Sequence, residues 1–65
     1  MTLSPLRRQL AQLEAKVHRA SEARRALPPG SSRARVTTAN ARWATACEAR
    51  DRVLRQIEET ERTDP

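Results

Sequence analysis

The stretch Pro28-Pro29-Gly30-Ser31-Ser32 lies near the middle of the 65-residue chain and separates two long segments with a helical pattern. Two successive prolines remove two backbone N–H donors and fix two φ angles, so a helix cannot continue through them. Gly30, the only glycine, permits a sharp reversal of the backbone, and a serine after it can cap a new helix. Residues 28–32 are therefore predicted to form the bend of a helical hairpin.

Before the bend, apolar residues recur at alternating steps of three and four, which is the spacing of a coiled-coil stripe. In the heptad notation abcdefg, the a and d positions are Leu3, Leu6, Leu10, Leu13, Val17, Ala20, Arg24 and Leu27. Ser4 offers a side-chain acceptor to the first turn, and Pro5 suits the first helical position. The pattern predicts a helix over about residues 4–27 with Ser4 as its N-cap.

The same spacing resumes after the bend and predicts a second helix over about residues 33–61. Its a and d positions are Val36, Ala39, Trp43, Ala46, Arg50, Val53, Ile57 and Thr60. Cys47 and Leu54 follow at e positions and widen the apolar stripe, so this helix is expected to meet more than one neighbour. Trp43 is in phase with the stripe and is expected to be buried near Ala20 of the first helix.

The two helices predict an all-α antiparallel hairpin that occupies residues 1–65 as one unit. A core of this size is marginal, and a single cysteine excludes an intrachain disulfide. Two helices cover one side of their stripe and leave the other side in water, so we expect a homo-oligomer, most simply a dimer that forms a four-helix bundle. Docking on a different protein is the alternative. The predicted interaction seam consists of Leu6, Leu10, Leu13, Val17, Trp43, Arg50, Val53, Leu54 and Ile57.

Two of the a positions hold arginine instead of an apolar residue, at Arg24 and Arg50. One interpretation makes these side chains polar groups that set the helix register or contact a partner. The other interpretation, which the sequence favours, is that their aliphatic stems pack while their guanidinium groups reach water.

The positive charge of the chain is concentrated around the bend. Thirteen Lys and Arg against eight Asp and Glu give a net charge of +5, and residues 15–47 hold seven cations and one acid. A basic tip of this kind attracts phosphate groups without selecting a base sequence, whereas a solvated arginine surface is the simpler interpretation. The residues predicted to bind an anion are Arg24, Arg25, Arg33, Arg35 and Arg42.

Catalytic, cofactor-binding and metal-binding residues are not expected. One cysteine and one histidine supply neither a nucleophile–base pair nor a ligand set, and there is no glycine-rich loop. We therefore expect that the protein is not an enzyme. The sequence also lacks an apolar run of membrane-spanning length and the apolar region of a signal peptide, so we expect a cytoplasmic protein without a membrane partner.

These features favour a small protein-interaction module, such as a regulator, adaptor or assembly factor, that acts as an oligomeric helical hairpin. The alternative is a nucleic-acid-binding protein that uses the arginine-rich bend end. Salt-dependent binding to nucleic acid distinguishes the two hypotheses, because phosphate contacts release counterions.

Overall fold

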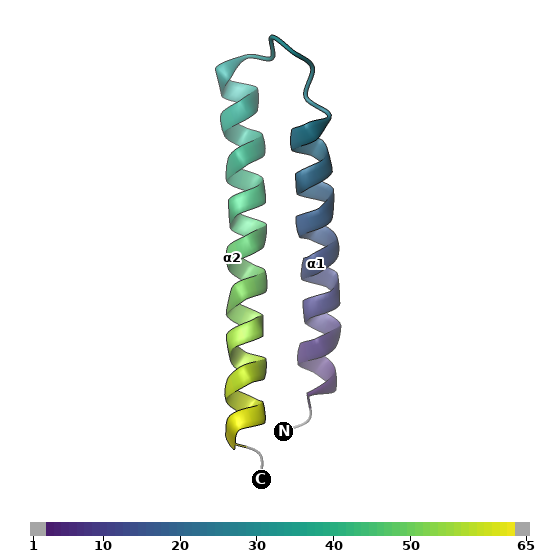
Figure 1. Ribbon diagram of the computed structural model, residues 1–65, viewed down its shortest axis with the longest axis vertical. Helices are drawn as coiled ribbons and strands as arrows, with labels where there is room; N and C mark the ends of the chain where they lie inside the picture. The colour runs from purple at the N-terminus through teal and green to yellow at the C-terminus, as the bar shows by residue number, and fades with distance from the viewer. Residues whose placement is uncertain (1–2, 64–65) are drawn as a thin grey trace.

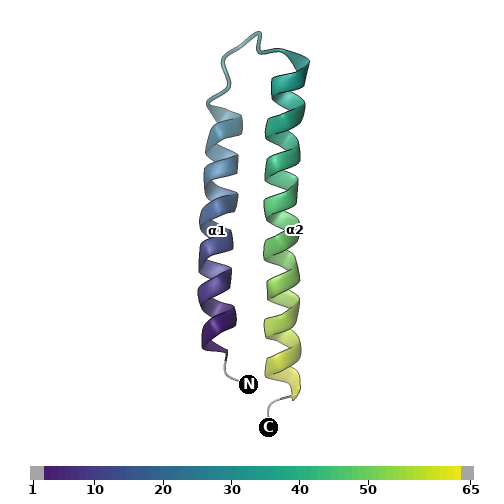
Figure 2. The same cartoon turned by 180° about the vertical axis from the view of Figure 1, so that it is seen from behind.

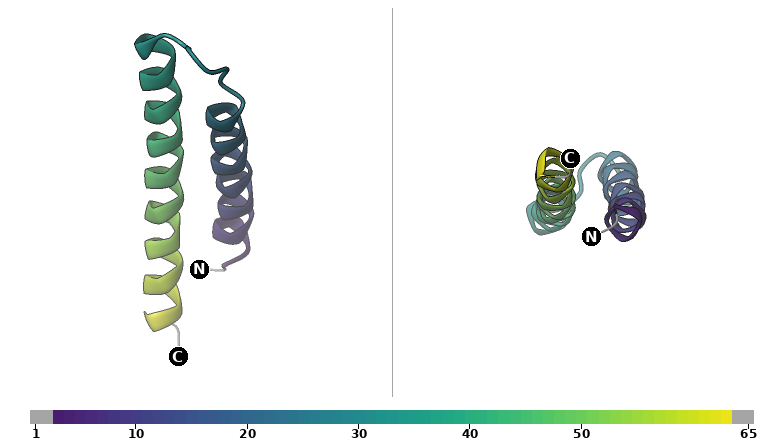
Figure 3. Two further views of the ribbon diagram at one scale, coloured as in Figure 1. Left: turned by 45° about the horizontal axis from the view of Figure 1, so that its top comes forward. Right: turned by 90° about the horizontal axis from the view of Figure 1, so that it is seen from below.

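The computed structural model describes residues 3–63, which form two helices that pack against each other (Figure 1). α1 spans Ser4–Arg25 and α2 spans Arg33–Thr63. The helices run antiparallel and lie side by side when seen from behind (Figure 2) and from below (Figure 3). The predicted all-α helical hairpin is confirmed. Within the described residues, neither helix combines the length and the apolar character needed to cross a membrane.

The bend contains a tight turn formed by Pro28, Pro29, Gly30 and Ser31. The Ser31 amide donates to the Pro28 carbonyl oxygen over 3.2 Å, and Gly30 has a φ of 85°. Proline in the second place, a glycine with positive φ in the third and this hydrogen bond are the features of a type II turn. The Ser31 hydroxyl also donates to the Pro28 carbonyl oxygen, over 2.6 Å, and so reinforces the reversal.

The start of α2 is capped by Ser32. The Arg35 amide donates to the Ser32 hydroxyl oxygen over 3.3 Å, and the Val36 amide donates to the Ser32 carbonyl oxygen over 3.1 Å. This side-chain bond satisfies one of the amides that a helix start leaves without a partner. The two serines of the bend therefore have different roles: Ser31 closes the turn and Ser32 caps the helix.

The prediction that Ser4 caps α1 is wrong. Ser4 is the first helical residue, the N-cap position is Leu3, and among residues 3–63 no side chain caps this end. The Arg7 amide donates to the Leu3 carbonyl oxygen over 2.9 Å, which makes the first helical hydrogen bond one residue earlier than the Ser-Pro signal suggested. Leu3 is half-buried and belongs to the apolar stripe.

The far ends of both helices also differ from the prediction. α1 ends at Arg25 rather than at Leu27, and its C-cap is Ala26, whose amide donates to the Glu22 carbonyl oxygen over 2.9 Å. Leu27 precedes Pro28, and the residue before a proline is disfavoured in helical backbone. α2 continues to Thr63 rather than ending at residue 61. In its last turns the hydroxyl of Thr60 donates to the Gln56 carbonyl oxygen over 2.8 Å.

The core is thin and lies toward the open end of the hairpin, where α1 begins and α2 ends. Val53 and Ile57, exposed by 5% and 8%, are the buried side chains among residues 3–63. Trp43, expected to be buried, is half-buried. The other half-buried a and d positions are Leu3, Leu6, Leu10, Leu13, Val17, Ala20, Leu27, Ala39, Ala46, Arg50 and Thr60.

The hairpin is a narrow rod. It measures 54 × 14 × 11 Å, and its radius of gyration is 15.3 Å, whereas a compact domain of this length has a radius of about 11 Å. Its accessible surface is 5321 Å² at a mass of 7.4 kDa. A compact monomer of that mass exposes roughly 4,200 Å², so this chain exposes about 1,100 Å² more.

Candidate functional site

Two faces flank the packed stripe of the hairpin. In an antiparallel helix pair, the e positions of both helices border one face and the g positions border the other. We call the first the Cys47 face, because α2 contributes Asn40, Cys47, Leu54 and Glu61 to it at intervals of seven residues. We call the second the cationic groove, because it is hollowed and lined by Lys16, Arg19, Arg35 and Arg42.

Two contacts between the helices mark the ends of the Cys47 face. Near the bend, Arg24 Nε donates to Asn40 Oδ1 over 2.8 Å. At the open end, the guanidinium group of Arg7 lies 3.8 Å from the carboxylate of Glu61, with both side chains more than half exposed. An exposed ion pair contributes little stability. Both contacts join an e position of α2 to α1, so the row that contains Asn40 and Glu61 borders α1 at both ends of this face.

Arg24 also covers part of the tryptophan ring. Its guanidinium carbon lies 4.5 Å from the centroid of the Trp43 ring, within the range of a cation–π interaction. The Arg24 side chain remains exposed, yet α2 holds its guanidinium group through both Trp43 and Asn40. This geometry supports the interpretation that Arg24 sets the register of the two helices.

Arg50, the second arginine on the stripe, makes no comparable contact with α1 in the described structure. It is half-buried, and its Nε and terminal nitrogen donate to Asp51 Oδ1 over 3.2 and 3.1 Å. The stem of Arg50 therefore packs on the stripe while its head group is held by the neighbouring residue of the same helix.

The Cys47 face carries aliphatic side chains that remain in water. Leu54 is 36% exposed, and Val36, at an a position near the bend, is 38% exposed. Cys47 is a half-buried free thiol. Of the nine residues predicted for the interaction seam, Val53 and Ile57 are buried and Leu54 is exposed, and those that are half-buried are Leu6, Leu10, Leu13, Val17, Trp43 and Arg50.

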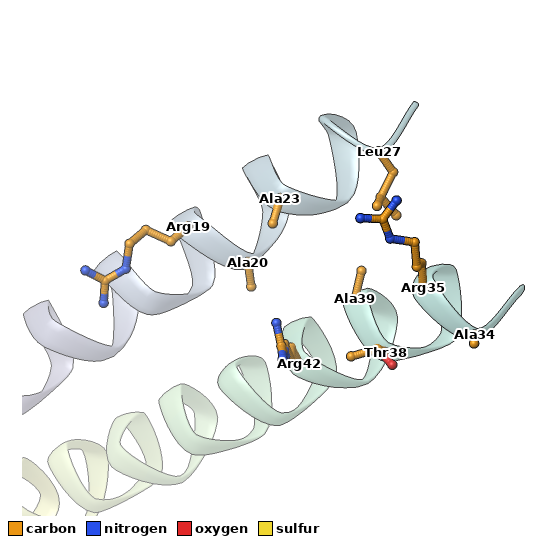
Figure 4. Close-up of a pocket in the computed structure, with 9 residues that line it drawn as sticks. All are labelled: Arg19, Ala20, Ala23, Leu27, Ala34, Arg35, Thr38, Ala39 and Arg42. Atoms are coloured by element: carbon orange, nitrogen blue, oxygen red, sulfur yellow. The ribbon is translucent and has the colours of Figure 1, made fainter. Parts of the chain in front are cut away.

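The opposite face contains a shallow groove with a floor of small residues. A cavity of about 560 Å³ near the bend is followed along the hairpin by one of about 590 Å³, and both are lined by Ala20, Thr38 and Arg42. Figure 4 shows Ala20 and Ala23 projecting from α1 toward α2, with Ala39 projecting back from α2. The cations that line these cavities are Lys16, Arg19, Arg35 and Arg42.

The structure divides the five arginines predicted to bind an anion. Arg35 and Arg42 line the cationic groove, whereas Arg24 is held on the Cys47 face. The Arg25 guanidinium lies 3.5 Å from the Glu22 carboxylate, in an exposed pair on the same helix. The remaining member of the set is the first residue of α2, Arg33.

Lys16 and Arg19 were missing from the predicted set, although they line the groove beside Arg35 and Arg42. Two features together could have indicated this: Lys16, Arg35 and Arg42 are g positions and Arg19 is a c position, and all four lie in the half of the hairpin near the bend. Within residues 3–63, none of the four takes part in an ion pair. Their charge is therefore available to an anion.

The two faces offer different chemistry. The Cys47 face presents aliphatic groups, which are stabilised when a partner removes them from water. The cationic groove presents four cations beside an apolar floor, which attracts an anionic partner. No protein-family model, no curated protein and no solved structure matches this chain.

Proposed function

We propose that the protein is a small protein-interaction module that acts as a homodimer, in which two hairpins form a four-helix bundle. The thin core carries this proposal, because Val53 and Ile57 alone are buried among residues 3–63. A second hairpin placed on the Cys47 face covers Leu54 and the half-buried part of the stripe. A two-fold dimer is the simplest assembly that buries the same face on both chains.

The hairpin exposes more surface than a compact monomer of its mass, and this excess area is similar to the area that each partner buries in a stable dimer. The surface of 5321 Å² exceeds that of a compact monomer by about 1,100 Å². A standard protein–protein interface buries about 800 Å² on each partner. Dimerisation through one face therefore removes most of the excess.

The dimer suits a regulator, an adaptor or an assembly factor. When the Cys47 faces are buried against each other, the cationic groove of each hairpin stays on the outside of the bundle and is free to bind a third component. We place the module in the cytoplasm, since its one cysteine has no partner in the chain and persists as a thiol in a reducing compartment.

A second candidate function is the binding of nucleic acid along the cationic groove. The observation that favours it is the presence of Lys16, Arg19, Arg35 and Arg42 on one face without an ion-pair partner in the described structure. Such cations neutralise phosphate groups and give binding that depends strongly on salt. The chain has one aromatic residue, so stacking on bases contributes little.

Sedimentation equilibrium at micromolar concentration tests the homodimer. We expect the wild-type chain to show twice its mass of 7.4 kDa. Leu54→Glu places a charge on the Cys47 face and is expected to shift the protein to the monomer. Gln56→Glu adds the same charge to an exposed position on another side of α2 and is expected to leave the dimer intact. A wild-type monomer that melts cooperatively contradicts the proposal.

A further inference from the structure

We propose that the two hairpins of the dimer pack antiparallel, with the bend end of one beside the open end of the other and the two-fold axis beside Cys47. The inference rests on the homodimer proposed above. It identifies the partner of the Cys47 face as a second copy of this chain in one defined orientation.

Two hairpins that bury the same face around a two-fold axis have two possible arrangements. If the axis runs along the helices, the two bend ends lie together, and α2 lies over α1 of the partner subunit. If the axis crosses the helices, each bend end lies beside the open end of the partner, and α2 packs on α2 of the partner in the opposite direction. Both arrangements bury the same apolar surface, so the charges decide between them.

The charge distribution favours the antiparallel arrangement. Residues 15–47, which form the bend end, hold seven cations and one acid, and the rest of the chain holds six cations and seven acids. An arrangement with the bend ends together brings two strongly positive segments side by side. The antiparallel arrangement instead places each positive segment beside a segment of slightly negative charge, which lowers the electrostatic repulsion.

The charged ends of the row of e positions on α2 are complementary when the row is reversed. The row reads Arg33, Asn40, Cys47, Leu54 and Glu61, so Cys47 is its centre and the two ends carry opposite charges. When two copies of α2 cross in opposite directions at Cys47, Arg33 lies opposite Glu61 of the partner subunit and joins the exposed pair that this carboxylate forms with the arginine at position 7 of its own chain. The symmetry repeats this pairing at the other end of the contact. Cys47 also lies near the midpoint of α2, so the two helices overlap over nearly their full length.

Distance measurement between two nitroxide spin labels tests the orientation. The label is placed at Ala34→Cys in a Cys47→Ala background, which keeps a small apolar group at the centre of the interface. Ala34 is exposed and lines the cationic groove, so the label lies outside the Cys47 face. Because residue 34 lies thirteen residues from residue 47, at a rise of 1.5 Å per residue, the antiparallel dimer separates the two labels by about 40 Å.

A label at Glu48→Cys, in the same background, is the matched control. Glu48 is exposed and adjacent to the proposed axis, so in the antiparallel dimer its two labels are expected to lie within about one bundle width of each other, roughly 20 Å. In the other arrangement the two copies of α2 lie diagonally across the bundle, and the Ala34 and Glu48 labels are expected to give equal distances. A distance near 40 Å for the Ala34 label together with a distance near 20 Å for the Glu48 label supports the inference. Equal distances for the two labels overturn the antiparallel orientation while leaving the homodimer in place.

The failure of the homodimer itself has a different signature. If the chain is a monomer, neither label shows a dipolar interaction, and sedimentation of both labelled variants gives the mass of one chain. That result overturns the proposed function and, with it, the orientation inferred here.

Discussion

The guanidinium carbon of Arg24 lies 4.5 Å from the centroid of the Trp43 ring, so the two helices are joined by a cation–π contact at an a position of each. The same guanidinium group donates to Asn40 Oδ1 over 2.8 Å. These two contacts hold one α1 side chain against two successive turns of α2. They fix the register near the bend, where the described core has no buried side chain.

Arg24→Ala is therefore expected to lower the free energy of unfolding by about 1–2 kcal/mol, because it removes a cation–π contact and a hydrogen bond to a charged group. Urea denaturation followed by circular dichroism measures the loss. Arg25→Ala is the matched control, since Arg25 forms an exposed pair within α1 and is expected to cost less than about 0.5 kcal/mol. Equal effects of the two substitutions contradict the role assigned to Arg24.

Ile57→Ala tests the location of the core. Ile57 is 8% exposed, and its truncation is expected to cost about 2–4 kcal/mol through lost apolar contact and the cavity that remains. Ile57→Val removes one methylene group and is expected to cost about 0.5–1.5 kcal/mol. The midpoints of thermal unfolding, measured at one protein concentration, are expected to be lower for Ile57→Ala than for Ile57→Val. A loss below about 0.5 kcal/mol for Ile57→Ala would show that the packed end of the hairpin is misplaced.

Gly30→Ala tests the turn. Gly30 has a φ of 85°, and no atom lies within 4 Å of a Cβ built at this position, so the cost comes from the backbone and not from crowding. We expect a loss of about 1–2 kcal/mol, the usual cost of a left-handed conformation for a residue with a Cβ. Gly30→Asn is expected to cost less, since asparagine adopts this conformation more readily. Chemical denaturation of both variants checks the order, and a neutral alanine variant contradicts the turn geometry.

The hairpin itself could be predicted from the sequence because its signals are local. Residues 28–32 contain both the helix breakers and the capping serine, and the stripe of a and d positions extends along both helices. The N-cap of α1 was predicted one residue late, because Ser4 and Pro5 have the features of a helix start while Leu3 holds the N-cap position. Local capping signals contain no information about tertiary packing.

The functional faces were harder to predict because they depend on which residues meet across the two helices. The contact of Arg24 with Trp43 requires a register that periodicity alone leaves open. The charge count along the chain grouped Arg24 with Arg35, although the structure places them on opposite faces. Lys16 was omitted from the predicted anion-binding set for the same reason. It is far from Arg42 in the sequence, although both residues line the same cavity.

If nucleic acid binds in the cationic groove, substitutions in the groove are expected to weaken binding more than substitutions elsewhere on the basic surface. Replacing both Arg35 and Arg42 by serine removes two cations from the groove, and neither residue is in an ion pair within residues 3–63. We expect weaker binding of a labelled RNA or DNA duplex in fluorescence anisotropy. If both arginines contact phosphates of duplex DNA, the slope of log affinity against log salt falls by about 1.8, or 0.9 for each contact.

The matched control replaces Arg52 and Arg55 by serine, which removes the same charge from exposed positions of α2 toward the open end. Because these residues lie outside the groove, the control is expected to keep the salt slope of the wild type, although the lower net charge weakens binding slightly at low salt. Equal losses in the two variants would show that binding follows the net charge and not the groove. If the wild type fails to bind either nucleic acid at low salt, the groove has no role in nucleic-acid binding, and the homodimer remains as the proposed function.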